Sequence, residues 1–472
     1  MKTALDTLTR RRLVQLGAGG YLGLNLGGVW RAAAASSPSV PLPGSLQPLR
    51  ACILVFYYGG PSHLDTYDLK PEAPSEVRGE FQPISTSVSG LHICEHLPKM
   101  ARQMHHVALV RSVTHQARLH DSASIHALTG RPLEGPDREL FAPQPQTYPS
   151  YGSAVSYLRR HQSTDVPFAS LPFPFRNVHD VPCQGGGLVG SRFDPLCIEV
   201  DPDKKRYQIE VLKRPEGLNA IRQQDRRSLL DSLDHTPGKG LTAGAGLREF
   251  YEKAYRLLDS ERIRQALDIA QEPATMRERY GFGAIDPATA NQGGAENAYA
   301  RAMRGQNVLL ARRLVEAGVP FVNVYDFRQQ GQNWDAHASC MNQHKSFLLP
   351  QADQSLATLI EDLEERGLLD TTLIVAMGEF GRTPTINVNA GRDHWPDCYT
   401  VLFAGGGTRG GHVHGSSDRL GAYPATDPVT PGDLAATIYW RFGFDPASEV
   451  HDALGRPHRL SDGEPIRSLF SV

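Results

Sequence analysis

Four short stretches of this sequence place a carboxylate beside an imidazole. The pairs are His63 with Asp65, His120 with Asp121, Asp335 with His337, and Asp393 with His394, and Glu379 adds a fifth acidic group. Imidazole nitrogens and carboxylate oxygens together suit zinc, manganese and other borderline or hard divalent cations. Such an ion polarises a phosphoryl or sulfuryl oxygen, or lowers the pKa of a bound water to ~7. The pattern therefore indicates hydrolytic metal chemistry.

Two arginines could add an anion-binding function to these groups. Arg382 and Arg392 stand close to the last pair in the sequence and could hold a tetrahedral oxyanion through paired hydrogen bonds. Each acid–imidazole pair also has a structural explanation, because a histidine near an aspartate is often a satisfied loop pair, and such aspartates form turns. The repetition of the acid–imidazole pairs favours a metal or oxyanion site, since every pair follows a predicted strand on the same side of one sheet.

Apolar runs predict the strands that would position these groups. Residues 51–58 (ACILVFYY) are typical of a strand buried on both faces of a parallel sheet. Further strands are predicted at 107–113, 321–325, 371–375 and 399–404, and helices at 122–128, 308–317 and 346–366. Strand, long helix and strand over residues 321–375 form a βαβ crossover, which implies parallel pairing. In such sheets ligands bind outside the carboxyl ends of the strands.

The N-terminal segment has the features of an export signal. Residues 9–14 (TRRRLV) are close to a twin-arginine motif, and residues 32–35 (AAAA) offer a cleavage site after a glycine-rich apolar run. We expect a signal peptide over residues 1–35 and a linker over 36–50, with the mature protein in the periplasm or at the cell surface. An amphipathic surface helix is the alternative explanation of the same residues.

Residues 51–472 are expected to form one domain with a helical insertion at about 200–295.

The chain of 472 residues carries 49 Lys and Arg against 51 Asp and Glu, a net charge of −2 that gives no electrostatic argument for nucleic acid. No segment of the mature chain has the ~18 apolar residues of a membrane span. G-x-S-x-G is absent, which argues against an α/β-hydrolase, and the six cysteines include no C-x-x-C.

Longer motifs then point to a family. GGPSHLDTYD at 59–68, NWDAH at 333–337, GEFGRTP at 378–384, GRDHWP at 391–396 and AGGGTRGGHVHGSSD at 404–418 together resemble the bacterial family called domain of unknown function 1501. That family is similar to the alkaline phosphatase and sulfatase superfamily. The resemblance implies a three-layer α/β/α sandwich with a mostly parallel sheet, and hydrolysis of phosphate or sulfate esters with divalent metals.

The resemblance also implies roles for particular residues. Glu379 and Phe380 stand where the superfamily has a metal-binding aspartate and histidine, and His394 resembles the later metal-binding histidine. Asp335 and His337 resemble an aspartate and a histidine of the other metal site.

The segment at residues 120–132 resembles the one that carries the sulfatase nucleophile. His120 takes the place of the nucleophilic Cys or Ser, so the resemblance implies no formylglycine and no ordinary sulfatase chemistry. Ser122 and Ser124 are the nearby hydroxyl groups.

We therefore predict an exported metal-dependent hydrolase of a phosphate or sulfate ester that uses metal-activated water or an unidentified nucleophile. The predicted metal ligands are Asp335, His337, Glu379 and His394, with Asp65 and Asp393 in addition, and His120, His63 and Arg382 are the predicted catalytic residues. Zinc, manganese or calcium would be the metal, and a small-molecule or polysaccharide ester the substrate. The alternatives are an exported scaffold that keeps the fold without turnover, and an oxidoreductase with a redox metal on the same ligands.

Overall fold

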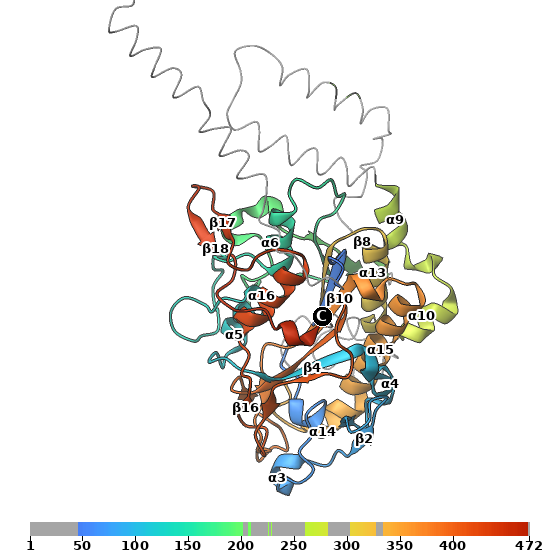
Figure 1. Ribbon diagram of the computed structural model, residues 1–472, viewed down its shortest axis with the longest axis vertical. Helices are drawn as coiled ribbons and strands as arrows, with labels where there is room; N and C mark the ends of the chain where they lie inside the picture. Colours follow the sequence, from blue (N-terminus) through green and yellow to red (C-terminus); the bar gives the residue numbers. More distant parts are fainter. Residues whose placement is uncertain are drawn as a thin grey trace, which may run out of the picture.

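An eight-stranded sheet runs through the centre of the computed structural model (Figure 1), in the order β14-β4-β13-β10-β1-β9-β5-β6. Its strands are β1 (Ala51–Phe56), β4 (Val107–Val113), β5 (Ala169–Leu171), β6 (Leu196–Cys197), β9 (Phe321–Tyr325), β10 (Thr372–Met377), β13 (Tyr399–Gly405) and β14 (Val413–His414). All neighbours pair in parallel except β13, which is antiparallel to both β10 and β4. The predicted mostly parallel sheet is confirmed.

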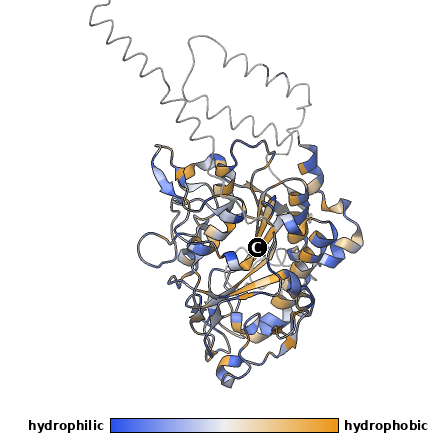
Figure 2. Ribbon diagram, in the orientation of Figure 1, coloured by the Kyte–Doolittle hydropathy of each residue, from blue (hydrophilic) through white to orange (hydrophobic). Residues whose placement is uncertain are grey.

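Helices cover both faces of the sheet. One face packs on α4 (Pro98–Gln103), α13 (Arg304–Glu316) and α15 (Leu349–Glu365), and the other on α5 (His120–Thr129), α6 (Tyr151–Leu158) and α16 (Pro431–Arg441). Side chains alternate between the faces, so that in β1 Ile53 contacts the first layer and Leu54 the second. Figure 2 shows the apolar strands between the two helical layers. This arrangement is the predicted three-layer α/β/α sandwich.

The structure describes residues 46–201, 206–208, 225, 228, 260–281, 303–326 and 334–470. The predicted signal peptide and residues 36–45 of the linker lie outside these residues, as does most of the predicted insertion at 200–295. Two helices of that insertion are described, α9 (Glu261–Leu267) and α10 (Ala274–Tyr280), and they pack against α13 and α15. None of the helices within the described ranges has the length and apolar character needed to cross a membrane.

The antiparallel placement of β13 decides where the functional loops gather. Residues 378–398 leave the carboxyl end of β10 and return to the amino end of β13, so that both ends of this loop lie at one edge of the sheet. Within the loop, β11 (Gly381–Arg382) and β12 (His394–Trp395) form a short antiparallel ladder. The glycine-rich residues after β13 consequently lie at the opposite edge.

Candidate metal centre

Two loops and one helix start bring polar side chains together at the carboxyl edge of β1, β9 and β10. His120 is the first residue of α5, and Asp335 and His337 belong to the loop after β9. Glu379 follows β10, and His394 opens β12. Because the ends of parallel strands meet at one edge, residues from distant parts of the chain converge here.

Asp335 lies at the centre of this group. Its Oδ1 atom is 2.9 Å from Nε2 of His337 and 3.0 Å from Nε2 of His394, and its Oδ2 atom is 3.2 Å from Nε2 of His120. The donor atoms of His120, Asp335 and His394 all lie within 4.8 Å of one another. His337 Nε2 is also 3.0 Å from His394 Nε2.

The opposite ring nitrogen of each histidine is held by an oxygen atom. His120 Nδ1 lies 2.8 Å from Glu379 Oε1, His337 Nδ1 lies 2.7 Å from Asp393 Oδ1, and His394 Nδ1 lies 2.7 Å from the carbonyl oxygen of Arg118. A carboxylate or carbonyl oxygen only accepts hydrogen bonds, so each Nδ1 carries the proton. All three Nε2 atoms therefore face Asp335, where each can bind a cation or a second proton.

This donor set fits a divalent cation. Metal-binding histidines almost always donate their second ring N–H to a carboxylate or a backbone carbonyl, as all three do here. In a tetrahedral site with bonds of about 2.0–2.1 Å the ligand atoms lie ~3.3 Å apart, close to the 2.9–3.2 Å seen around Asp335. The carboxylates of Asp335, Glu379 and Asp393 and the guanidinium of Arg382 leave a net charge of −2 when the imidazoles are neutral.

A family model described as "Protein of unknown function (DUF1501)" matches residues 49–470 of this chain. The chain belongs to the DUF1501 family. No curated protein matches it.

Solved structures resemble the DUF1501 chain in outline. A mutant of the alkaline phosphatase PafA has a TM-score of 0.41 and 8% identity, over 91% of this chain and 100% of that chain. Ps i-CgsB in complex with k-i-k-neocarrahexaose has a TM-score of 0.39 and 11% identity, over 84% and 73%. The phosphonate monoester hydrolase SpPMH from Silicibacter pomeroyi has a TM-score of 0.35 and 15% identity, over 90% and 76%.

Glu379 and Asp393 were predicted as metal ligands, but in the DUF1501 centre their carboxylates contact the Nδ1 atoms of His120 and His337 on the side away from Asp335. The fully buried Glu379 carboxylate accepts from His120 Nδ1 and from the backbone N–H of Gly59, both at 2.8 Å. Gly59 has a φ of 104°, which favours glycine and lets its N–H approach the carboxylate. Asp393 accepts from Nδ1 of His337, so each of the two acids holds one of the imidazoles that face Asp335.

Arg382 is committed to the protein itself. Its buried guanidinium lies 2.6 Å from Asp335 Oδ1 and donates to the carbonyl oxygens of Gly59, Gly60 and Arg392. These bonds use four of its five N–H donors on a fully buried side chain, so its contacts serve to hold Asp335 in place.

The structure does not bring Asp65 and His63 into the centre. Both oxygens of the buried Asp65 carboxylate pair with Arg392, at 2.7 and 3.0 Å. The predicted ligand Asp65 and the predicted anion binder Arg392 thus satisfy each other in a fork-to-fork pair. His63 Nε2 lies 2.7 Å from the carbonyl oxygen of Gly421, and burial lowers the pKa of this imidazole.

At the position resembling the sulfatase nucleophile, His120 instead aims its Nε2 at Asp335. The hydroxyl of Ser122 donates to the Arg138 carbonyl, 2.9 Å away. The sequence did not reveal Glu139, whose two carboxylate oxygens accept from the N–H groups of His120 and Asp121 at 2.9 and 3.0 Å. No sequence signal links Glu139 to a helix start 19 residues earlier, although this contact fixes the first turn of α5.

Without a cation the DUF1501 centre binds protons. Burial opposes protonation of His120, but hydrogen bonds to Asp335 and Glu379 outweigh it and raise the pKa to about 9. Burial also acts against ionisation of Asp335, yet its hydrogen bonds to the three histidines lower its pKa far below the ordinary range. The hydrogen bond to Asp335 raises the pKa of His337, whereas burial lowers the pKa of His394.

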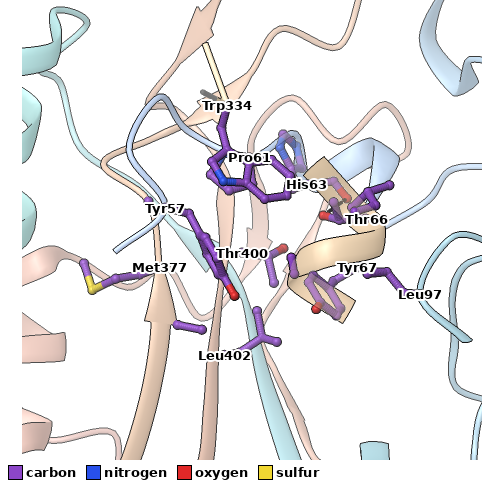
Figure 3. Close-up of a pocket in the computed structure, with 14 residues that line it drawn as sticks. Tyr57, Pro61, His63, Thr66, Tyr67, Leu97, Trp334, Met377, Thr400 and Leu402 are labelled. Carbon is purple, nitrogen blue, oxygen red and sulfur yellow. Dashed lines mark hydrogen bonds between the residues drawn. The ribbon is translucent and has the colours of Figure 1, made fainter. Parts of the chain in front are cut away.

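A small cavity of about 30 Å³ lies next to the centre, between β10 and α15 (Figure 3). Aromatic and aliphatic side chains line most of it, including Tyr57, Tyr67, Trp334 and Leu402. Trp334 precedes Asp335, and its Nε1 donates to Asp326 at 2.9 Å. Because this lining is largely apolar, we assign the cavity to packing, and the chemistry to the polar cluster around Asp335.

Proposed function

We propose that this DUF1501 protein is a metal-dependent hydrolase of a phosphate or sulfate ester. The observation that carries the proposal is the convergence of three Nε2 atoms on Asp335, each on a ring whose Nδ1 is held by an oxygen acceptor. Lone pairs in such a group repel one another unless a cation or protons lie between them. The resemblance to alkaline phosphatases and sulfatases directs the proposal to these esters.

The ligands in this proposal are His120, Asp335, His337 and His394. Three imidazoles and one carboxylate suit zinc or manganese better than calcium, which prefers oxygen ligands. A divalent ion held there supplies a Lewis acid that activates water and polarises the ester. Asp393 and His337 are the most exposed members of the centre, so the ester would approach over them.

Ring contacts with Phe380 hold two of the proposed ligands, His120 and His394, in their positions. The Phe380 ring stacks on His394 at 4.4 Å between centroids and lies 5.1 Å from the His120 ring. Phe380 stands where the superfamily has a metal-binding histidine, and in this chain it orients two other imidazoles. Water is the proposed nucleophile, because His120 stands where the resemblance places a nucleophilic Cys or Ser, and the nearby Ser122 hydroxyl donates to the Arg138 carbonyl.

We further propose export of the folded protein by the twin-arginine route, on the basis of the motif at residues 9–14. The substrate would then be a small-molecule or polysaccharide ester outside the cytoplasm.

Elemental analysis of the natively exported protein, combined with aryl phosphate and aryl sulfate hydrolysis before and after chelation, tests the proposal. We expect about one zinc or manganese per chain, and hydrolysis that is lost with the metal and restored by adding it. Bound metal without turnover of any ester would favour the scaffold alternative. A redox-active metal with electron transfer would favour the oxidoreductase.

A further inference from the structure

Three arginines among the described residues near the metal centre are each paired with a carboxylate. Arg382 is bonded to Asp335, and Arg392 to Asp65, and both side chains are fully buried. The half-exposed Arg118 lies beside the ligands, because its carbonyl holds His394 and it precedes His120 by two residues. Its guanidinium is 2.5 Å from Asp397.

Among the described residues around Arg118, the carboxylates of Asp137, Glu139 and Asp397 outnumber the guanidinium groups of Arg118 and Arg138, and Arg138 donates to the carbonyl oxygens of Glu134 and Pro136. Besides Asp397, the carboxylate of Asp137 accepts from the backbone N–H of Arg118 at 2.8 Å, and Glu139 accepts from the N–H of His120 at 2.9 Å. A divalent ion would balance the net charge of −2 on the centre itself. The described residues around it then leave no positive charge in excess to attract a doubly charged group.

The net charge of the site therefore affects which substrate charge it can bind. A phosphate monoester carries nearly two negative charges above about pH 7, whereas a sulfate ester, a phosphate diester or a phosphonate monoester carries one. When the described charges of a site give no excess of positive charge, a second negative charge on the substrate adds a Coulomb repulsion that a singly charged substrate does not experience.

We propose that the centre selects singly charged tetrahedral esters, and that Asp397 contributes to this selectivity by neutralising Arg118. This inference rests on the proposed function. The position of Arg118 is held near His394, since its guanidinium also lies over the ring of the next residue, Trp395, at 5.4 Å from the centroid. Removal of the Asp397 charge would leave Arg118 in place as an unpaired cation beside the metal centre.

The test measures anion binding to full-length protein loaded with Co²⁺, whose visible spectrum reports on ligands at the metal. The probes are phenylphosphonate, doubly charged at about pH 8.5, and its monomethyl ester, singly charged with the same ring. The ratio of the two dissociation constants is compared between variants, which cancels the intrinsic preference of cobalt for the dianion. Asp397→Asn should shift this ratio towards the dianion by roughly threefold or more.

Arg118→Gln should shift the ratio in the opposite direction, because it leaves Asp397 unpaired while keeping the backbone carbonyl that holds His394. Asp370→Asn is the matched control, since the exposed Asp370 precedes β10 at the far edge of the sheet. An unchanged ratio in both variants, or shifts in the same direction, would overturn the inference.

Hydrolysis rates show which kind of singly charged ester, a sulfate or a phosphonate monoester, is the preferred substrate. Wild-type protein should hydrolyse an aryl sulfate or an aryl methylphosphonate faster than the matching aryl phosphate, and the faster of the first two identifies the chemistry. A faster aryl phosphate would contradict the inference while leaving the proposed hydrolase intact. Failure to bind cobalt would be seen before any anion is added, and would overturn the proposed function and this inference together.

Discussion

The Nδ1 atom of His120 lies 2.8 Å from Oε1 of Glu379, although 259 positions separate the two residues. Glu379 stands at the end of β10 and His120 at the start of α5, and neither side chain is exposed to solvent. The contact fixes the proton of His120 on Nδ1 and leaves Nε2 directed at Asp335. The proposed metal centre thus depends on an acid that need not touch the metal.

Replacement of Glu379 by Gln should weaken metal binding by about 10- to 100-fold while the fold is retained. An amide keeps the shape of the side chain but loses the negative charge that orients the His120 ring. Competition titration against a chelator measures the affinity. Glu80→Gln removes a carboxylate from an exposed pair with Lys345 and should leave affinity unchanged. Equal affinities in the two variants would refute the orienting role.

His394→Ala should abolish stoichiometric metal binding and any ester hydrolysis. The imidazole is one of three around Asp335, and its position in a short loop ladder contributes little to the core. Elemental analysis checks the loss, and thermal melting of the metal-free proteins should agree within a few degrees. His92→Ala, on the exposed side of β3 (His92–Cys94), is the control. Full metal content in His394→Ala would rule out its role as a ligand.

Acid should destabilise the protein through buried neutral histidines such as His344. Its Nδ1 donates to the Cys340 carbonyl at 2.8 Å, and burial lowers its pKa from the ordinary 6.5 to about 4. The unfolded chain therefore takes up a proton first, and stability is lost as the pH falls from about 6.5 to about 4. The contribution is on the order of 3 kcal/mol.

Urea unfolding at neutral pH and near pH 4.5 measures this loss. His344→Asn keeps a donor near the position of Nδ1 but has no proton to gain, so its unfolding free energy should depend less on pH. A pH dependence identical to that of the wild type would show that His344 does not titrate on unfolding.

Val375→Asp should prevent soluble expression. Val375 is fully buried in β10 between Leu54 of β1 and Phe403 of β13. An unpaired charge there costs several kcal/mol, comparable to the whole stability margin of about 5–15 kcal/mol. Val388→Asp is the matched control, because Val388 is 100% exposed and the same substitution should be tolerated there. A soluble Val375→Asp protein that melts cooperatively would show that β10 is not central.

Joint replacement of Arg10 and Arg11 by Lys should trap an uncleaved precursor in the cytoplasm. A twin-arginine signal requires both guanidinium groups, so lysines that keep the charge do not substitute for them. Fractionation and the molecular mass of the product provide the measurement. Arg12→Lys leaves the arginine pair intact and should be processed normally. Normal processing of the double variant would exclude this export route.

Much of the scaffold could be predicted from the sequence, because burial imposes local patterns. Strands buried on both faces require continuous apolar runs, and the runs at 107–113 and 321–325 coincide with β4 and β9. The motifs of the DUF1501 family are also local, and the family match confirmed them. The antiparallel direction of β13 was not predicted, because an apolar run has no direction and the loop before it allows either pairing.

The sequence by itself determined which acids and imidazoles were available and that they follow strands. Only the tertiary structure decided which atoms meet, because hydrogen-bond partners hundreds of residues apart depend on strand order and side-chain reach. Asp65 and Asp335 resemble each other in sequence, but Arg392 occupies both oxygens of Asp65, while three imidazoles face Asp335. A carboxylate satisfied by a guanidinium gains little from a metal, whereas one surrounded by nitrogen lone pairs needs a cation or protons.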